Sequence, residues 1–273
     1  MNDKRQRGRP RSFHDKTEQN TIQSLDRAMA VLERLAEGNG PTLSELSDEL
    51  GQSPATVYRI LVTLQQRDIV ESDQGDQTWF VGPKAFLIGS SFLRRTHLFE
   101  RSRPIMQRLM EETAETANLG VERNGQVMFL SQVETHLSIR AFFPPGTLSP
   151  LHASGIGKAL LAQYSEERLG KFLDASSLDP FTATTFTDKG KLAEELALTR
   201  KRGFALDDEE RTPGMRCVAA PIFNAHGDPV AGISVSGPTS RVGPEDVERL
   251  ATSVKAAARD ISIGMGARPE MVK

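Results

Sequence analysis

Four consecutive residues carry groups that could hold a small anion. Ser154, Gly155, Ile156 and Gly157 come directly before a helical pattern at residues 158–161. Free backbone amides at the start of a helix, with the helix dipole behind them, attract negative charge. The two glycines would also let a ligand approach the backbone closely. This segment therefore predicts one half of a binding site.

A strand pattern near the end of the chain supplies a second set of polar groups. Ser234 and Ser236 alternate with Ile233 and Val235, so a strand would place both hydroxyls on one face and both apolar side chains on the other. Hydroxyls and amides together suit a two- or three-carbon oxoacid, whose carboxylate needs hydrogen-bond donors. Serines that only bond to neighbouring backbone would show the same pattern, so both interpretations stay open.

Three further residues have types that occur in reactive sites. Asp207 could accept a hydrogen bond from a hydrated aldehyde but would repel a carboxylate, so we expect it at the far end of a ligand. Cys217 fits a pocket lining and a buried core equally well, and His152 fits a structural histidine. The alternative is an enzyme acting on a small carboxylate, with Cys217 as nucleophile, His152 as base and Asp207 as orienter. Because no Gly-x-Ser-x-Gly elbow accompanies them, we expect no enzyme.

Neither a nucleotide nor a metal is predicted. Residues 155–158 resemble part of a phosphate-binding loop, but the full pattern needs a glycine where His152 stands and Ser or Thr where Ala159 stands. The five histidines and single cysteine are scattered and form no metal-ligand spacing. We therefore expect no cofactor.

A predicted helix that begins at Pro54 offers a surface suited to DNA. Its apolar positions, Val57, Ile60, Leu61 and Leu64, share one face. The opposite face is slim and rich in hydrogen-bonding groups, as a helix in the major groove requires. That face contains Ala55, Thr56, Arg59, Thr63 and Gln66.

The surrounding pattern is that of a winged helix-turn-helix. Residues 22–35 have a helical apolar stripe, formed by Ile22, Leu25, Met29, Leu32 and Leu35. Thr42 and Glu45 make a capping-box pattern for a short second helix, and Gly51-Gln52 with Ser53 predict a tight turn and a cap before the third. A hairpin pattern between residues 69 and 81 would be the wing. A three-helix packing unit with a solvated face is the alternative.

A basic segment precedes this unit. Residues 1–20 are polar and basic, and they contain Arg7-Gly8-Arg9-Pro10. Such sequences occur in arms that enter narrow minor grooves, so Arg7 and Arg9 are candidate DNA contacts. Basic tails that only touch phosphates or stay solvated have a similar composition. The position directly before a winged helix favours a DNA-binding arm.

Bulk properties limit the other possibilities. With 273 residues we expect two domains. The net charge of -2 requires any nucleic-acid contact to come from a local basic patch. A single cysteine allows no intramolecular disulfide, and no apolar run is long enough for a bilayer. These features predict a cytoplasmic protein that does not associate with a membrane.

Taken together, several segments resemble the IclR family of bacterial regulators over residues 21–265. The matching segments are 22–28, 56–59, 151–159, 207–210, 214–221 and 233–238. The resemblance implies an α+β fold with four parts: an arm at 1–20, a winged helix-turn-helix at 21–82, a linker helix at 83–97 and a GAF-like α/β effector-binding domain at 98–273. It also implies a homodimer or homotetramer that binds palindromic double-stranded operator DNA.

The resemblance also implies which residues make contacts. The DNA-binding set would be Arg7, Arg9, Gln52, Ser53, Ala55, Thr56, Tyr58, Arg59 and Thr63. The effector set would be the amides of Gly155 and Ile156, the apolar wall of Met215, and Asp207, Cys217, Ser234 and Ser236. These residues are similar to those of members that respond to glyoxylate or pyruvate, so we expect a ligand-responsive transcriptional regulator of carbon metabolism, such as one controlling glyoxylate assimilation by the β-hydroxyaspartate cycle.

Overall fold

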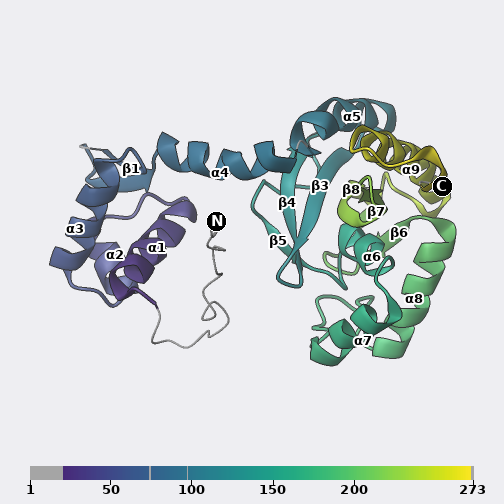
Figure 1. The fold of residues 1–273 in the computed structure, drawn as a ribbon, viewed down its shortest axis with the longest axis horizontal. Helices are drawn as coiled ribbons and strands as arrows, with labels where there is room; N and C mark the ends of the chain where they lie inside the picture. The colour runs from purple at the N-terminus through teal and green to yellow at the C-terminus, as the bar shows by residue number, and fades with distance from the viewer. Residues whose placement is uncertain (1–20, 74, 97, 272–273) are drawn as a thin grey trace, which may run out of the picture. The chain divides into compact units, whose positions relative to one another are not determined.

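The computed structural model describes residues 21–73, 75–96 and 98–271. The predicted basic arm, with Arg7 and Arg9, lies outside these residues. The chain divides into two compact units between Phe92 and Leu93. This boundary falls inside helix α4, Pro83–Thr96, which occupies the predicted linker (Figure 1).

The first unit contains three helices and a hairpin. Thr42 accepts a hydrogen bond from the Glu45 amide, at 3.3 Å, and the Glu45 carboxylate accepts one from the Thr42 amide, at 2.8 Å, so the predicted capping box is present. Ser53 caps the third helix by accepting from the Thr56 amide at 3.2 Å. The elements are α1 Gln23–Ala36, α2 Leu43–Glu49, α3 Pro54–Gln65, β1 Val70–Asp73 and β2 Thr78–Val81.

One apolar cluster holds this unit together. Its buried members come from all three helices and from β1, and they are Val31, Leu35, Leu46, Val57, Leu61 and Val70. Strands β1 and β2 pair antiparallel, with Val70 opposite Val81. The predicted helix-turn-helix with a wing is therefore confirmed.

The stripe predicted along the first helix is only partly buried. Leu35 is buried, but Ile22, Leu25 and Met29 are 67%, 58% and 46% exposed. The buried positions of α1 are Val31 and Leu35, in its second half. The predicted stripe is present along the helix, but only its second half is buried, because apolar periodicity shows which side chains share a face and not whether another element covers them.

The second unit is built on a six-stranded sheet. The strand order is β5-β4-β3-β8-β7-β6, and every neighbouring pair is antiparallel. The elements after α4 are α5 Leu98–Thr113, β3 Thr116–Arg123, β4 Gln126–Val133, β5 Leu148–Pro150, α6 Gly155–Leu161, α7 Glu166–Ala175, α8 Lys189–Arg202, β6 Ala205–Asp208, β7 Met215–Phe223, β8 Pro229–Pro238, η2 Pro244–Asp246, α9 Val247–Gly264 and η3 Pro269–Met271.

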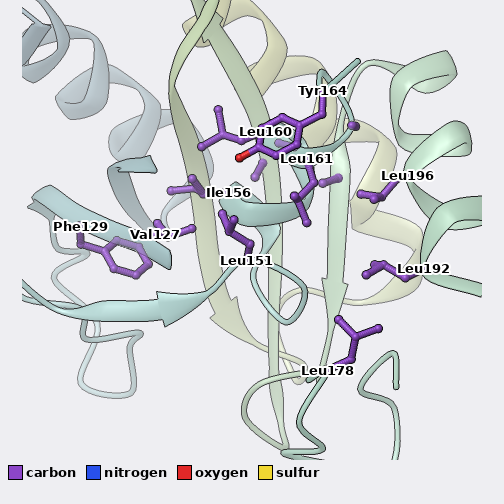
Figure 2. Packing of buried hydrophobic residues seen from close by; sticks show 14 residues of the cluster. Val127, Phe129, Leu151, Ile156, Leu160, Leu161, Tyr164, Leu178, Leu192 and Leu196 are labelled. Carbon is purple, nitrogen blue, oxygen red and sulfur yellow. The ribbon is translucent and has the colours of Figure 1, made fainter. Parts of the chain in front are cut away.

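Helices cover both faces of this sheet. Helices α5 and α9 pack together on one face, and α6 lies on the other with α8 beside it (Figure 1). Figure 2 shows the apolar cluster around α6, whose members include Ile156, Leu160 and Leu161 of that helix and Leu192 and Leu196 of α8. Within the described residues, no helix is long and apolar enough to cross a membrane.

Alternation along β8 follows the predicted pattern. The position of an added Cβ on Gly232 lies 2.8 Å from Cγ2 of Ile156, so this face of β8 looks toward α6. Ser234 and Ser236 share that face because side chains repeat every second residue. Ile233 and Val235 therefore point toward the α5 and α9 layer, where they are buried.

Candidate functional site

A small cavity lies in the second unit between the start of α6 and strands β6, β7 and β8. All seven residues predicted to bind an effector line it: Gly155, Ile156, Asp207, Met215, Cys217, Ser234 and Ser236. The space open to the centre of a water-sized sphere is about 20 Å³. That volume accommodates about one or two water molecules, so any ligand held here must be very small.

The start of α6 forms one wall. Ser154 caps this helix by accepting a hydrogen bond from the Gly157 amide at 3.3 Å. Among the described residues, no protein acceptor lies within hydrogen-bonding distance of the amides of Gly155 and Ile156. An added Cβ on Gly155 would lie 2.8 Å from Sγ of Cys217. Glycine is required here because α6 sits directly on β7.

The opposite wall consists of buried hydroxyls on β8. Asn118 of β3 donates from Nδ2 to the hydroxyls of Ser236, at 3.2 Å, and Ser234, at 3.5 Å. Gln132 in turn donates to Oδ1 of Asn118 at 3.1 Å. Both serines are thus oriented by a side-chain network, and each hydroxyl keeps its own proton to donate. The alternative of serines bonded only to neighbouring backbone does not describe this arrangement.

Cys217 stands opposite Ser236 in the sheet register. Burial raises the pKa of its thiol to about 11, with the nearby Asp207 carboxylate adding to the rise. The side chain is therefore a neutral thiol at physiological pH. Because the thiolate is the nucleophilic form of cysteine, Cys217 acts here as a small lining group with a weak S–H donor.

Asp207 lies at the end of the cavity formed by β6. Its Oδ1 accepts a hydrogen bond from the Glu210 amide at 2.9 Å. Burial raises the pKa of Asp207 to about 6, although the charge of Lys158 and two backbone amides oppose the rise. This carboxyl group therefore changes its charge close to neutral pH.

A buried ion pair supports the Asp207 end. Lys158 of α6 is fully buried, and its Nζ donates to the carbonyl of Leu206 and to Oε1 of Glu210. The Lys158 ammonium also lies 4.9 Å from the centre of the Phe186 ring. Burial raises the pKa of Glu210 despite this partner, and its Oε2 has no hydrogen-bond partner among the described residues.

Sequence reasoning missed the role of Lys158 and several lining residues. The signal for Lys158 was a lone charge inside the apolar run from Ile156 to Leu161. The lining residues that lie outside every segment singled out in the sequence are Phe129, Phe143, Ser149, Arg211 and Thr212. Phe143 stacks on Phe129 with ring centres 4.8 Å apart, and Arg211 lies 3.9 Å from the Phe181 ring centre.

The residues of the enzyme alternative are not assembled. His152 is absent from the cavity lining, and its Nε2 lies 3.1 Å from the carbonyl of Asp179. Burial lowers the pKa of this imidazole. With His152 engaged elsewhere and Cys217 held as a thiol, the arrangement lacks an activated nucleophile.

The predicted DNA-reading face of the first unit lies on α3. Ala55, Tyr58, Arg59 and Thr63 are exposed, and Thr56 is half-buried. Arg59 and Thr63 border a groove of about 440 Å³ between α1 and α3, together with Arg27 of α1. The Thr63 hydroxyl donates to the carbonyl of Arg59 at 2.6 Å, which leaves its oxygen able to accept.

The other predicted DNA contacts within the described residues lie at the start of α3. Ser53 is exposed and its hydroxyl lies 2.9 Å from the hydroxyl of Thr56. Gln52 is half-buried, and its Oε1 has no hydrogen-bond partner among the described residues. The structure thus places the members of the predicted set that it describes at one end and along one face of α3, while Arg7 and Arg9 lie outside the described residues.

Comparison with known proteins matches both units. Residues 24–74 match the model described as "IclR helix-turn-helix domain", and residues 90–263 match "Bacterial transcriptional regulator IclR C-terminal". The regulator BhcR of Paracoccus denitrificans is 51% identical over 269 residues, which cover 97% of this chain and 96% of that protein. The transcriptional repressor IclR of Escherichia coli K12 is 41% identical over 90% of each chain.

A solved structure supports the same relationship. The Thermotoga maritima IclR structure superposes with a TM-score of 0.79 at 30% identity. It covers 90% of this chain, and all of that chain is matched. The likeness therefore extends across the helix-turn-helix and the antiparallel-sheet unit.

The buried pair of Lys158 and Glu210 gives a stability prediction. Lys158→Met leaves the Glu210 carboxyl buried without its cation, and we expect a loss of about 3–5 kcal/mol in the free energy of unfolding. The double variant Lys158→Met/Glu210→Leu should recover most of that loss, because apolar replacement of a whole buried pair is nearly neutral. Urea unfolding of the full chain, followed by circular dichroism, measures this.

Trp79, the single tryptophan, provides an internal control because it packs against the core of the first unit. Its fluorescence transition should stay in place in both variants. A Lys158→Met variant as stable as the wild type, or a double variant less stable than the single one, would contradict the assigned role of the pair.

Proposed function

The chain belongs to the IclR family of bacterial transcriptional regulators, and on that premise we propose that it senses a small 2-oxoacid such as glyoxylate or pyruvate. It binds operator DNA and a small-molecule effector, as regulators of this family do, and it is not an enzyme. The observation that supports an oxoacid as the ligand is that backbone amides, serine hydroxyls and Asp207 line one very small cavity.

The chemistry of the cavity supports an oxoacid. The free amides of Gly155 and Ile156 and the hydroxyls of Ser234 and Ser236 offer donors for a carboxylate. Asp207, at the other end, offers an acceptor for a hydrated aldehyde or keto group. The cavity of about 20 Å³ must open slightly even for such an acid, and the close packing of Ile156 and Met215 disfavours an aromatic acid.

DNA recognition is assigned to α3 and the arm. In this proposal the exposed face with Ala55, Tyr58, Arg59 and Thr63 enters the major groove, and Gln52, Ser53 and Thr56 contact DNA near the start of the helix. Arg7 and Arg9 of the arm would enter the minor groove beside it. A target on the chromosome places the protein in the cytoplasm.

The proposed protein acts as a homodimer or homotetramer on a palindromic operator. The exposed apolar side chains of Leu25 and Met29 on α1, and of Ile22 directly before it, support association, because exposed apolar patches commonly mark interfaces. A monomeric mass in sedimentation analysis at micromolar concentration would contradict this part of the proposal.

Effector binding would alter operator affinity by a population shift. An oxoacid that binds one arrangement of the effector unit more tightly favours that arrangement, and the coupling equals its differential affinity for the two. Helix α4 carries the boundary between the two units, so it is the covalent connection through which a change would pass. Two operator half-sites lie about one turn of the DNA apart. Both can be bound at once only if the two recognition helices keep a matching distance, so a small change in that distance weakens binding.

A titration tests the gating. Glyoxylate and pyruvate should each change the affinity for an operator fragment, measured by fluorescence anisotropy, whereas acetate should act weakly. Ser236→Ala should raise the effector concentration at half-effect by about 10-fold or more, as expected for a hydrogen bond to a charged group. Ser131→Ala, a buried serine of the same sheet outside the cavity lining, is the matched control. Operator affinity that is flat in all oxoacids refutes the sensing proposal.

The raised pKa of Asp207 gives a pH dependence. Above about pH 6 this group is ionised and repels an anionic ligand, and below it the neutral form does not. Affinity for the oxoacid should therefore fall as the pH rises from 5 to 7, by at most about tenfold per pH unit for one proton. Other groups beside Asp207 shift the pH at which affinity changes, but affinity still falls as the pH rises. These groups are Lys158, Glu210, Arg211 and Cys217.

The Asp207→Asn variant should show a shallower pH dependence over the same interval, since the amide stays neutral and only Glu210, whose pKa is raised by burial to about 7, still titrates beside the cavity. Isothermal titration calorimetry at pH 5.0, 6.0 and 7.0 measures both proteins. An equally steep dependence in Asp207→Asn would show that another group titrates.

Arg59 gives a prediction for DNA recognition. Arg59→Ala should cost about 1–3 kcal/mol of specific operator binding and relax the base preference at one position. Lys189→Ala, which removes an exposed cation of the second unit, should leave operator affinity unchanged. The measurement is anisotropy with operator and scrambled duplexes at two salt concentrations. An equal loss on both duplexes would reassign Arg59 to a phosphate contact.

A further inference from the structure

A second, larger cavity lies in the sheet unit, away from the proposed effector site. It occupies about 470 Å³ between the end of α8, the middle of α9 and the end of β7. This volume falls within the range of about 300–1,000 Å³ that small-molecule sites occupy. The proposed effector cavity is far smaller, so the two spaces suit different ligands.

The lining of this cavity is strongly basic. Four cations border it, namely Arg200, Lys201, Arg202 and Lys255, against one carboxylate, that of Glu270. The chain as a whole carries a net charge of -2. The positive charge is therefore a local feature of this cavity and not a consequence of overall composition.

Only one of these cations is neutralised. Arg202 pairs with Glu195 at 2.6 Å. Within the described part of the chain, no carboxylate lies within ion-pair distance of Arg200, Lys201 or Lys255. Three formal positive charges therefore face one carboxylate across an open space.

The position of Arg200 is fixed by the end of α6. Its Nε donates to the carbonyl of Ala162 and its Nη2 to the carbonyl of Tyr164, both at 2.5 Å. A guanidinium carries five N–H donors, and these two bonds leave others available. Arg200 is thus held in place by neutral groups and keeps its full charge.

The helix dipole explains only part of this cluster. Arg200, Lys201 and Arg202 form the last turn of α8, where cations stabilise the helix end. Lys255 lies in the middle of a different helix, α9, and gains nothing from that effect. Its side chain passes close to Gly203, where an added Cβ would lie 3.4 Å from Cδ, and its ammonium lies 5.8 Å from the Phe204 ring centre.

We propose that this cavity binds a small, multiply charged anion that carries phosphate or several carboxylate groups. Cations from two helices, α8 and α9, border the same space, so several anionic groups on one ligand could each meet a positive charge. Gln163, directly after α6, adds a neutral amide to the lining. This site is independent of the oxoacid site, which lies at the other ends of α6 and β7.

Calorimetry with inorganic pyrophosphate tests the proposal. The full-length protein is titrated at constant ionic strength, with citrate as a parallel arm that separates phosphate from polycarboxylate recognition. We expect saturable binding in at least one arm. Lys201→Gln/Lys255→Gln should weaken it by about tenfold or more, since two charges near the ligand are removed.

Lys171→Gln is the matched control because it removes an exposed lysine of α7 outside the cavity. It should stay within twofold of the wild type. Retained operator binding and an unchanged circular dichroism spectrum show that the double variant is folded. If the double variant unfolds, the titration is carried out with Lys201→Gln alone, because this side chain is exposed and its replacement should not disturb the fold.

Two results overturn the proposal: no saturable binding in either arm, or binding that the lysine substitutions leave unchanged. The second result would place the anion elsewhere on the chain, for example on the DNA-reading unit. Neither result bears on the oxoacid titration, which depends on Ser236 and Asp207.

Discussion

The close approach of α6 to the sheet is the constraint on which the rest of the second unit depends. Gly155 meets Cys217 with no room for a methyl group, and Gly232 meets Ile156 in the same way. A Cβ at either position would push the helix away from β7 and β8. Because α6 lies so close to the sheet, its first amides and the β8 hydroxyls border a space of only about 20 Å³.

This packing also explains why the site contains a buried lysine. A helix pressed onto the sheet carries Lys158 into the interior, where an unpaired charge would be costly. The Leu206 carbonyl and the Glu210 carboxylate accept hydrogen bonds from its ammonium group. The same positive charge opposes the rise in the pKa of Asp207. Lys158 is therefore neutralised by its own partners and also limits how far burial raises the Asp207 pKa.

Much of this could be predicted from the sequence where local patterns determine structure. The capping box of Thr42 and Glu45, the cap at Ser53 and the alternation around Ser234 are short-range features, and the structure has all three. The buried half of α1 was harder, because Ile22 and Leu25 follow the same helical pattern as Leu35 and only tertiary packing separates them. The arm lies outside the described residues, so its role stays a prediction.

Some residues of the cavity could likewise be predicted from the sequence, and others could not. Gly155 and Ser236 stand in recognisable segments, and the resemblance to IclR proteins pointed to Met215 and Cys217. Phe129, Phe143 and Arg211 come from separate parts of the chain and meet only through the antiparallel sheet order. No local sequence pattern indicates that these three residues come together. Lys158 left a signal, a charge within an apolar run, but its partner Glu210 lies 52 residues away.

The stack of Phe143 on Phe129 has a consequence for reprogramming the sensor. Most walls of the cavity belong to the sheet or to α6, where the glycine contacts forbid any added bulk and any retreat would disturb the core. Phe143 comes instead from the connection between β4 and β5, and it is only partly buried. Trimming this ring would enlarge the cavity without removing its hydrogen-bond donors, so larger ligands would gain entry through that side.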